Sequence, residues 1–244
     1  MEPRFRSDIK VILGEHCGSD SYTSRAAWVV PPDKEDKRDD RVGQERLINS
    51  CLRVHHNTPF EHGLMSVYLE APGVLWWQLT RQRFMSLDSE DFSFSLESGR
   101  YRVLEPEFYL PPPERPIREP GGFKAMKPVF APVEEEYHLA YTEHRQKLAI
   151  FSWRMYQEAI AQGVARESAR DLLPNWMLYC DGYCSAKPLT WLQFFQKRNK
   201  APETTVATYP QWEIQEFCRQ CEVFFQQLFP VMYQSFVNNG RVAP

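Results

Sequence analysis

The amino-acid sequence predicts an α+β fold, with a mixed or antiparallel sheet and long helices, in a single domain that covers residues 1–244. Some segments alternate apolar and polar residues, as strands do, and others repeat apolar residues every three or four positions, as helices do. These segments do not follow the regular strand–helix–strand rhythm of βαβ units. Hydrophobic residues make up 43% of the chain and charged residues 25%, an ordinary balance for a globular protein with a sizeable core.

The beginning of the chain is predicted to contain a strand, a loop and a helix. Residues 8–13 form the expected strand, and residues 31–41 form a charged loop. Asp39 or Asp40 then offers a side-chain cap for a helix over residues 42–55. The apolar residues of this helix share one face, as expected for a helix that packs on a core.

A helix start and a half-buried strand come next. In the segment TPFE, Thr58 is suited to the N-cap, Pro59 to the first helical position and Glu61 to closing a capping box. Residues 64–71 alternate apolar and polar side chains, which indicates a strand with one buried face. A short helix is expected over residues 72–84, because a proline opens it.

The rest of the chain is predicted to be mostly helical after a proline-rich stretch. Prolines and glycines mark the loops, and apolar periodicity marks the helices. One segment instead resembles a strand, with a glycine that could interrupt it. We expect a loop over residues 105–132, helices over residues 133–162, 166–173, 189–197 and 210–238, and a strand over residues 176–185.

Charge and hydropathy narrow the class of protein. The N-terminal sequence MEPRFRSDIK lacks the apolar core of a signal peptide, and no apolar run approaches a membrane span of about 18 residues. We therefore expect a soluble, cytoplasmic protein. The net charge of −3 argues against general nucleic-acid binding, although a few well-placed arginines would suffice to bind one phosphate.

The six cysteines are expected to be free, mostly buried thiols. Cys218 and Cys221 form a CxxC pair inside a helical pattern, and Cys180 and Cys184 lie in a strand-like segment. Neither pair has the turn residues of a zinc site, so we expect no metal.

Several arginines stand in patterns that suit anion binding. Arg81 and Arg83 are two positions apart on a predicted helix and therefore point about 200° apart, too far to serve one ligand group. Ser98, Gly99 and Arg100 follow a loop, and such a turn can present backbone N–H groups and a guanidinium to a phosphate. The alternative is structural, because arginines near helix ends also complement the helix dipole and such turns are common.

The remaining candidates are ambiguous when each is taken alone. TPFEH is more typical of a capping box than of a binding site. Arg170 could be a solvated charge on a helix face, and His56 could simply end a helix. Arg198 could complement the dipole of the helix that it ends. Trp212 is more typical of a core residue than of a side chain that stacks on a ligand.

Five segments together, in this order, resemble the flavin-dependent thymidylate synthase family. Each motif is weak alone, but the ordered set is specific, and the resemblance covers roughly residues 43–240. The segments are HNTPFEH (56–62), QLTRQR (78–83), SGRY (98–101), ARDLLP (169–174) and QWEIQ (211–215).

The chain also departs from the family pattern. Gln82 replaces the histidine of the family's Arg-His-Arg, and 14 residues rather than seven separate Arg83 from Ser98. Leu96 stands where the family has a glutamate, although Glu97, Ser89 or Glu90 could align there instead. An asparagine of the family appears as Ser185 or Lys187, and the loop after Arg198 is longer. These changes concern the nucleotide and flavin pockets, so they bear on the substrate more than on the fold.

The resemblance implies reductive methylation of C5 of dUMP to give dTMP. It implies FAD as cofactor, NADPH as reductant and 5,10-methylenetetrahydrofolate as carbon donor, with no cysteine nucleophile. It also implies a homotetramer with active sites at subunit interfaces. Such an enzyme positions its reactants while the cofactor supplies the difficult chemistry.

Matched motif positions give the expected site residues. Ser98 and Arg198 are expected to act in catalysis, with Arg198 near the uracil ring. The substrate-binding residues implied are Gln78, Ser98, Gly99, Arg100, Arg170 and Arg198. The cofactor-binding residues implied are His56, Thr58, Glu61, Arg81, Gln82, Arg83 and Gln193.

Two alternatives remain open. The same chemistry could act on UMP, or install another one-carbon group on a pyrimidine nucleotide in a specialised pathway. The chain could also be a homologue that binds flavin or nucleotide without methyl transfer.

Overall fold

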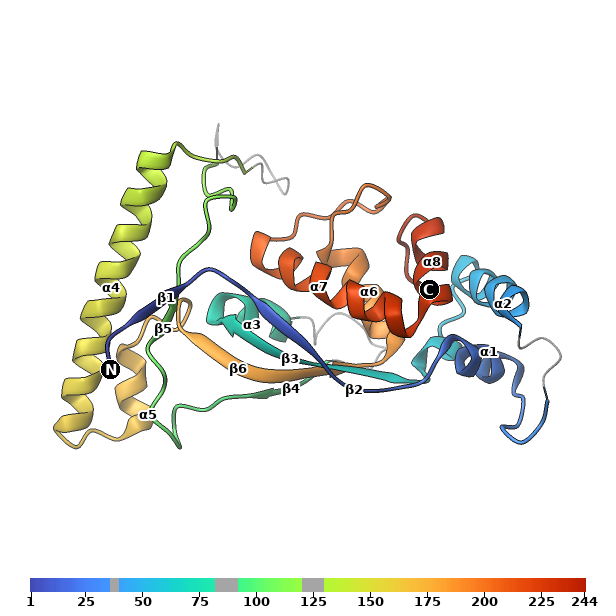
Figure 1. Ribbon diagram of the computed structural model, residues 1–244, viewed down its shortest axis with the longest axis horizontal. Coiled ribbons are helices and arrows are strands. Elements are labelled where there is room, and N and C mark those ends of the chain that lie inside the picture. The colour runs from blue at the N-terminus through green and yellow to red at the C-terminus, as the bar shows by residue number, and fades with distance from the viewer. Residues whose placement is uncertain (36–39, 82–91, 120–129) are drawn as a thin grey trace. The chain divides into compact units, whose positions relative to one another are not determined.

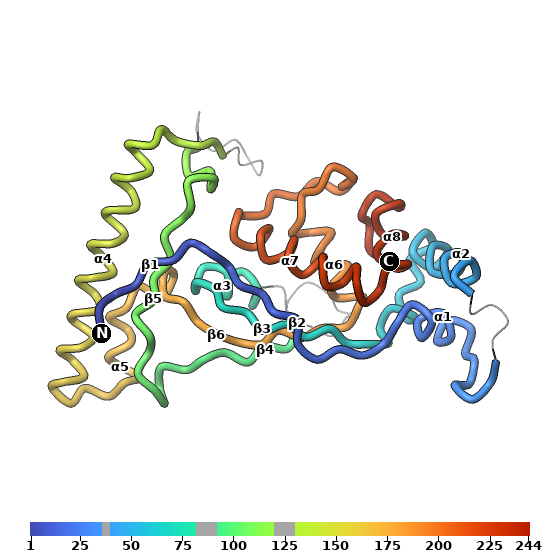
Figure 2. The backbone as a smooth tube through the Cα atoms, viewed as in Figure 1, coloured from blue at the N-terminus to red at the C-terminus, as the bar shows by residue number. Residues whose placement is uncertain are grey.

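The structure is a computed structural model that describes residues 1–35, 40–81, 92–119 and 130–244, and it has the expected α+β fold (Figures 1 and 2). The described residues form two compact units. Each unit is assembled from three separate stretches of sequence, so the expectation of a single domain stays a prediction. Unit 1 comprises Met1–Lys10, Glu70–Gln78 and Leu96–Gly182, and unit 2 comprises Val11–Leu69, Leu79–Ser95 and Tyr183–Pro244.

The strands of the described residues form two sheets. In the smaller sheet, β1 (Arg4–Arg6) pairs in parallel with β5 (Glu107–Tyr109), with Phe5 opposite Phe108. The larger sheet has four strands in the order β2-β3-β6-β4. Its strands are β2 (Lys10–Cys17), β3 (Leu64–Pro72), β6 (Tyr179–Ala186) and β4 (Ser93–Leu96).

β3 is the strand that the alternating pattern predicted, and every second side chain along it is fully buried. Side-chain contacts between β3 and β6 show the relative direction of the two strands. Ser185 Oγ donates a hydrogen bond to Ser66 Oγ over 2.9 Å, and the rings of Tyr68 and Tyr183 meet edge to face with centroids 5.4 Å apart. Residue numbers rise along β3 as they fall along β6, so the two strands are antiparallel. With the parallel β1–β5 pair, the strand directions are mixed, as expected.

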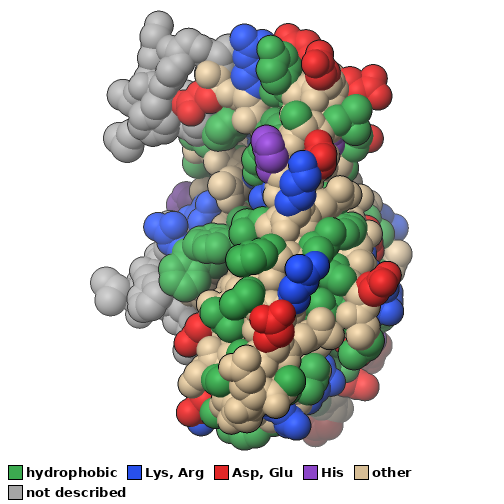
Figure 3. All heavy atoms as spheres, turned by 90° about the vertical axis from the view of Figure 1, so that its left-hand side faces the viewer, with side chains coloured by type: hydrophobic (Ala, Val, Ile, Leu, Met, Phe, Trp, Pro, Cys, Tyr) green, Lys and Arg blue, Asp and Glu red, His purple; other side chains and the backbone are tan. Residues whose placement is uncertain are grey.

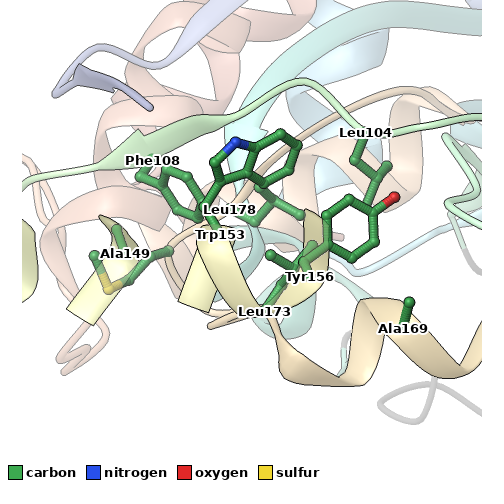
Figure 4. Close-up of a cluster of buried hydrophobic side chains, with 9 residues drawn as sticks. Leu104, Phe108, Ala149, Trp153, Tyr156, Ala169, Leu173 and Leu178 are labelled. Carbon is green, nitrogen blue, oxygen red and sulfur yellow. The ribbon is translucent and has the colours of Figure 1, made fainter. Parts of the chain in front are cut away.

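Unit 1 is organised around a long helix. One side of α4 (Glu135–Ala161) contributes Trp153 and Tyr156 to a cluster of buried apolar side chains that point toward one another (Figure 4). Trp153 Nε1 also donates a hydrogen bond to the carbonyl of Met1 over 2.9 Å, which holds the start of the chain against α4. The other helical segments of unit 1 are α3 (Gly73–Thr80), whose last two residues belong to unit 2, α5 (Arg166–Ala169) and η3 (Arg170–Leu172).

Unit 2 is a helical assembly with an aromatic core. Trp191 is fully buried and lies within 6.3 Å, between ring centroids, of Phe194, Phe195 and Phe217. The helical segments of unit 2 are α1 (Asp20–Trp28), α2 (Arg41–Arg53), η1 (Thr58–Glu61), α6 (Pro188–Arg198), α7 (Trp212–Leu228) and α8 (Pro230–Asn238). No described helix, in either unit, is both long and apolar enough to cross a membrane.

The predicted capping box at TPFE is wrong. The segment forms a single 3-10 turn whose N-cap is Asn57, and no side chain caps it. The hydroxyl of Thr58 is instead hydrogen-bonded to His56 Nε2 over 3.0 Å. The imidazole therefore takes the interaction that a capping box would need, and Thr58 remains beside His56 rather than at a helix end.

The last predicted helix is also wrong as a continuous element. α7 ends at Leu228 and α8 begins at Pro230, because Phe229 has a non-helical backbone and a proline cannot donate the helix hydrogen bond. The carboxylate of Asp20 accepts hydrogen bonds from the N–H groups of Val231 and Met232 over 2.8 and 3.0 Å, and so caps α8 from α1.

Other boundaries differ for local reasons. The strand expected over residues 8–13 runs over Lys10–Cys17, and the strand expected over residues 176–185 begins only after Met177 and Leu178 have turned back onto the carbonyl of Pro174. The helix expected over residues 166–173 is one α-helical turn followed by a 3-10 turn. β1, β4 and α1 were not predicted, and β5 lies in the expected loop 105–132.

Candidate functional site

Two of the predicted arginines converge on one residue in unit 1. The Nε atom of Arg100 lies 3.0 Å from Oε2 of Glu167, and the Nε atom of Arg170 donates to the backbone carbonyl of Glu167 over 3.2 Å. The SGRY and ARDLLP segments therefore lie against each other, although 67 residues separate Arg100 from Glu167. Arg166 adds a bond from its guanidinium to the carbonyl of Tyr101 over 2.9 Å.

The turn that carries Arg100 is closed by its own backbone and by the core. The N–H of Arg100 donates to Ser98 Oγ, and the N–H of Tyr101 donates to the carbonyl of Ser98, each over 3.3 Å. Gly99 is buried, and a Cβ atom there would lie 2.8 Å from Leu104, a member of the unit 1 core. The glycine lets the turn sit close to this core, and Arg100 projects from the turn with half of its side chain exposed.

Gln78 also lies in unit 1, on α3. Its Nε2 atom donates to the carbonyl of Val74, one turn earlier on the same helix, over 3.1 Å. Gly73, at the start of α3, is pressed against the carbonyl of Asn175, so that any side chain at this position would collide with backbone. The close approach fixes the start of α3 against the segment that follows ARDLLP.

Most of the predicted cofactor residues lie in unit 2. His56 and Thr58 are joined by the hydrogen bond described above, and His56 follows His55, which has a left-handed backbone with φ of 55°. Glu61 forms an ion pair with Lys187 over 3.6 Å. Lys187 is the N-cap residue of α6, so the HNTPFEH segment is tied to the helix that bears Gln193 and Arg198.

Arg198 has an unfavourable environment for a positive charge. Burial lowers the pKa of its guanidinium, and the nearby positive charge of Arg81 lowers it further. A partly buried group with a perturbed pKa is a candidate for a functional role. Gln82 and Arg83, the other two residues of the RQR motif, lie outside the described residues.

The cysteines are free thiols, and four of the six are buried, as predicted. Burial raises the pKa of Cys51, and it raises the pKa of Cys184, Cys218 and Cys221 well above the ordinary value. Burial, with the charges of Glu97 and Asp181, raises the pKa of Cys180 to about 12. These five thiols are therefore protonated at neutral pH, which is the wrong state for a nucleophile.

Sequence reasoning missed Glu167 as the residue that joins two motifs. Its contact with Arg100 depends on the fold, but its position three residues before Arg170 on a helical segment was a usable signal. Lys187 appeared only as one of two positions where the family has an asparagine. Its contact with Glu61 shows that it belongs beside the HNTPFEH segment.

Comparison with known proteins agrees with the motif pattern. A family model described as "Thymidylate synthase complementing protein" matches residues 13–231. The flavin-dependent thymidylate synthase of Streptomyces avermitilis is 32% identical over 250 residues, which cover 100% of this chain and 97% of the relative. That of Tropheryma whipplei is 31% identical over 251 residues, which cover 100% of this chain and 98% of the relative.

Solved structures give the same result. A crystal structure of a UMP/dUMP methylase PolB from Streptomyces cacaoi, bound with 5-Br UMP, superposes with a TM-score of 0.87 at 29% identity over 100% of both chains. The structure of that protein bound with 5-Br dUMP superposes with a TM-score of 0.86 over 100% of both chains. The fold is therefore that of this group over its whole length. The chain belongs to the flavin-dependent thymidylate synthase family of enzymes.

Proposed function

We propose that the protein methylates C5 of a pyrimidine nucleoside monophosphate in an FAD-dependent reaction, converting dUMP to dTMP. The observation that carries this proposal is the meeting of Arg100 and Arg170 at Glu167. It gives two guanidinium groups, from motifs far apart in sequence, a common location. A monophosphate is the part of the nucleotide that such a pair would recognise.

The energetics of this cluster favour exchange with a ligand. The Arg100–Glu167 ion pair is about half exposed on both sides, and such pairs contribute little to stability. A phosphate carries more negative charge than a carboxylate and can accept hydrogen bonds from the same planar guanidinium. It can therefore replace Glu167 as the partner of Arg100 at small cost. Ser98 and the N–H groups of its turn supply further hydrogen-bonding groups for the nucleotide.

The residues of unit 2 suit the chemistry of FAD. We assign His56, Thr58, Glu61, Arg81 and Gln193, with the undescribed Gln82 and Arg83, to cofactor binding. Imidazole, hydroxyl, carboxylate and amide groups match the donors and acceptors of a flavin, and a guanidinium matches its diphosphate. The bond between His56 and Thr58 orients the imidazole before any ligand arrives. FAD, when bound and reduced by NADPH, would supply the hydride, and methylenetetrahydrofolate would supply the carbon.

Arg198 would then use its positive charge to stabilise negative charge on the uracil ring. Its guanidinium is half-buried, and burial and the charge of Arg81 both lower its pKa. A uracil that gains negative charge during the reaction would be stabilised by this cation, and stabilisation of charge that develops in the transition state accelerates a reaction. The protonated, buried thiols support a route without a cysteine nucleophile.

We further propose a homotetramer, supported by an exposed apolar stripe on α4. Figure 3 looks onto this side of unit 1 and shows hydrophobic side chains gathered along the helix. The stripe repeats with alternating spacings of four and three residues, which is the spacing of a helix that packs against another helix. We name it the α4 stripe, and its apolar members are Tyr137, Tyr141, Leu148, Phe151 and Met155, with His144 at the intervening position, all exposed.

The test is release of tritium from 5-labelled nucleotide. Purified protein with FAD, NADPH and methylenetetrahydrofolate should release tritium from dUMP, and omission of the folate should lower the release to background. Anaerobic reduction of the bound flavin by NADPH, followed at its visible absorbance, checks the reductive half of the proposal. Flavin reduction without tritium release from any pyrimidine nucleotide would refute methyl transfer.

UMP is the second candidate substrate. It is favoured by the similarity to the PolB protein, whose structures carry both 5-Br UMP and 5-Br dUMP. The altered RQR motif and the longer segment before Ser98 point in the same direction, because they bear on the nucleotide pocket. The same assay with 5-labelled UMP separates the candidates by the ratio of the two kcat/KM values.

A further inference from the structure

The last turn of α6 is held by residues from near the end of the described chain. The Oε1 atom of Gln196, on this turn, accepts a hydrogen bond from the backbone N–H of Ala243 over 2.8 Å. Asn199 follows the turn, is buried, and donates through Nδ2 to Oε1 of Glu222 on α7 over 2.9 Å. Arg198 lies between these two attachment points.

Glu222 is a buried hub for these contacts. Its carboxylate forms an ion pair with Arg241, and it accepts a hydrogen bond from the hydroxyl of Tyr233 over 2.9 Å. Glu222 is 5% exposed and Arg241 is 2% exposed, so both charges are removed from water. A buried ion pair of this kind adds little net stability compared with apolar packing. The ion pair instead restricts the side chains of Glu222 and Arg241 to one relative geometry.

The backbone also fixes Arg241 in place. Arg241 has a left-handed conformation with φ of 58°, directly after Gly240 with φ of 68°. The N–H of Arg241 donates to the carbonyl of Phe236 over 2.9 Å, and the guanidinium lies over the Phe236 ring at 5.0 Å. The carbonyl of Gly240 accepts hydrogen bonds from both the N–H and the hydroxyl of Thr205. A residue kept in a sparsely populated conformation by this many contacts is typical of a functional constraint.

We infer that Gln196, Asn199, Glu222, Arg241 and Ala243 form a clamp on the last turn of α6 that positions Arg198 for its action on the nucleotide. The inference rests on the proposed role of Arg198 in methyl transfer. Its motivation is geometric: the residues on either side of Arg198, Gln196 and Asn199, are each hydrogen-bonded to a residue that follows α6 in the sequence. A displacement of about 1 Å of a reacting group can cost on the order of 100-fold in rate.

The experiment compares two substitutions at Gln196, on the holoenzyme. Gln196→Leu removes the acceptor for the N–H of Ala243. Gln196→Glu keeps an acceptor oxygen on a side chain of the same length. Gln196→Leu should lower kcat by about tenfold or more, while Gln196→Glu should stay within about threefold of the wild type. Arg241→Lys, which keeps the charge but loses the planar fork, should behave like Gln196→Leu.

A variant with a similar structural cost but no contact to α6 is the control. Trp153→Phe removes the hydrogen bond from the indole to the carbonyl of Met1, in the core of unit 1. It should lower the thermal midpoint as Gln196→Leu does and leave kcat near the wild-type value. If the loss of kcat in each of these variants, the control included, simply follows the loss in thermal midpoint, the clamp is only structural and the inference is overturned.

Two further readouts separate the clamp from the proposed function. In an Arg198→Lys background, Gln196→Leu should cause no further loss of kcat, and additive losses would contradict the inference. Hydrogen exchange of the amides of residues 197–199 should speed up in Gln196→Leu and Arg241→Lys but not in Trp153→Phe. This exchange does not depend on activity. Unchanged exchange therefore refutes the clamp, whereas absent tritium release by the wild type refutes methyl transfer.

Discussion

At the scale of single residues, Arg100 and Arg170 are the arginines that the motifs select, because guanidinium groups near a serine–glycine turn suit a phosphate. Their shared contact with Glu167 arises only when segments 67 residues apart are brought together, so no local pattern could predict it. The effect of Arg81 on the pKa of Arg198 likewise depends on burial and distance rather than on sequence spacing.

We expect Arg100→Ala and Arg170→Ala each to weaken nucleotide binding. Each substitution removes a charge-assisted hydrogen bond to the phosphate, at a cost of roughly 1.5–3 kcal/mol, or about ten- to a hundredfold in Kd. Calorimetric titration with dUMP and UMP measures this change. Gln82→Ala should have a smaller effect, and Arg219→Ala, which removes an exposed charge on α7, should leave Kd unchanged. Unchanged affinity in both the Arg100 and the Arg170 variant would show that the phosphate site lies elsewhere.

At the scale of elements, the start of the chain shows why short strands escape prediction. β1 has three residues, and its place is fixed by distant partners rather than by its own pattern. Arg6 forms hydrogen bonds with the carboxylates of Asp8, Glu70 and Glu107 over 2.7 to 3.1 Å, and its guanidinium lies 4.5 Å from the centre of the Tyr179 ring. By contrast, the alternation of β3 is a local signal and was predicted correctly, and the cap of α2 is Asp40, one of the two residues predicted for it.

We expect the Arg6 cluster to make stability depend on pH. The hydrogen bond from Arg6 holds the pKa of Asp8 below its ordinary value. Burial alone would raise the pKa of Glu70, but hydrogen bonds from Lys10 and Arg6 outweigh it and lower that pKa. A carboxylate with a lowered folded-state pKa stabilises the fold above its ordinary pKa, and this contribution is lost as pH falls below about 4. The largely buried Glu70 should dominate, because Asp8 is mostly exposed and screened.

Arg6→Met tests this cluster. It leaves Glu70 with Lys10 as its remaining cation and Glu107 with Arg4, so the free energy of unfolding at pH 7 should fall by about 1–3 kcal/mol. The variant should also lose less stability than the wild type between pH 7 and about pH 2, because protonation of its carboxylates no longer breaks bonds to Arg6. Urea unfolding at the two pH values measures both effects, and Lys147→Met, at an exposed ion pair on α4, is the control. Equal pH dependence in the wild type and Arg6→Met would contradict this explanation.

At the scale of the whole molecule, α4 has more apolar surface than unit 1 can bury. One side of the helix packs Ala149, Trp153 and Tyr156 into the core. The α4 stripe lies outside that core, and a row of exposed aromatic and aliphatic side chains of this length is typical of an interface. The sequence predicted the helix and its length well, but not which side would remain exposed, because apolar residues occur on more than one face.

We expect Phe151→Glu to break the tetramer. A second α4 would bury the exposed Phe151 at the centre of the stripe, and a carboxylate there would be desolvated without a partner. Light scattering should give a mass about four times 28.8 kDa for the wild type and a smaller species for Phe151→Glu. Val223→Glu changes an exposed apolar residue on α7 instead and should leave the mass unchanged. If each active site needs more than one subunit, tritium release should fall with the mass and recover at higher protein concentration, because association follows mass action. A wild-type monomer with full activity would exclude both the tetramer and the shared site.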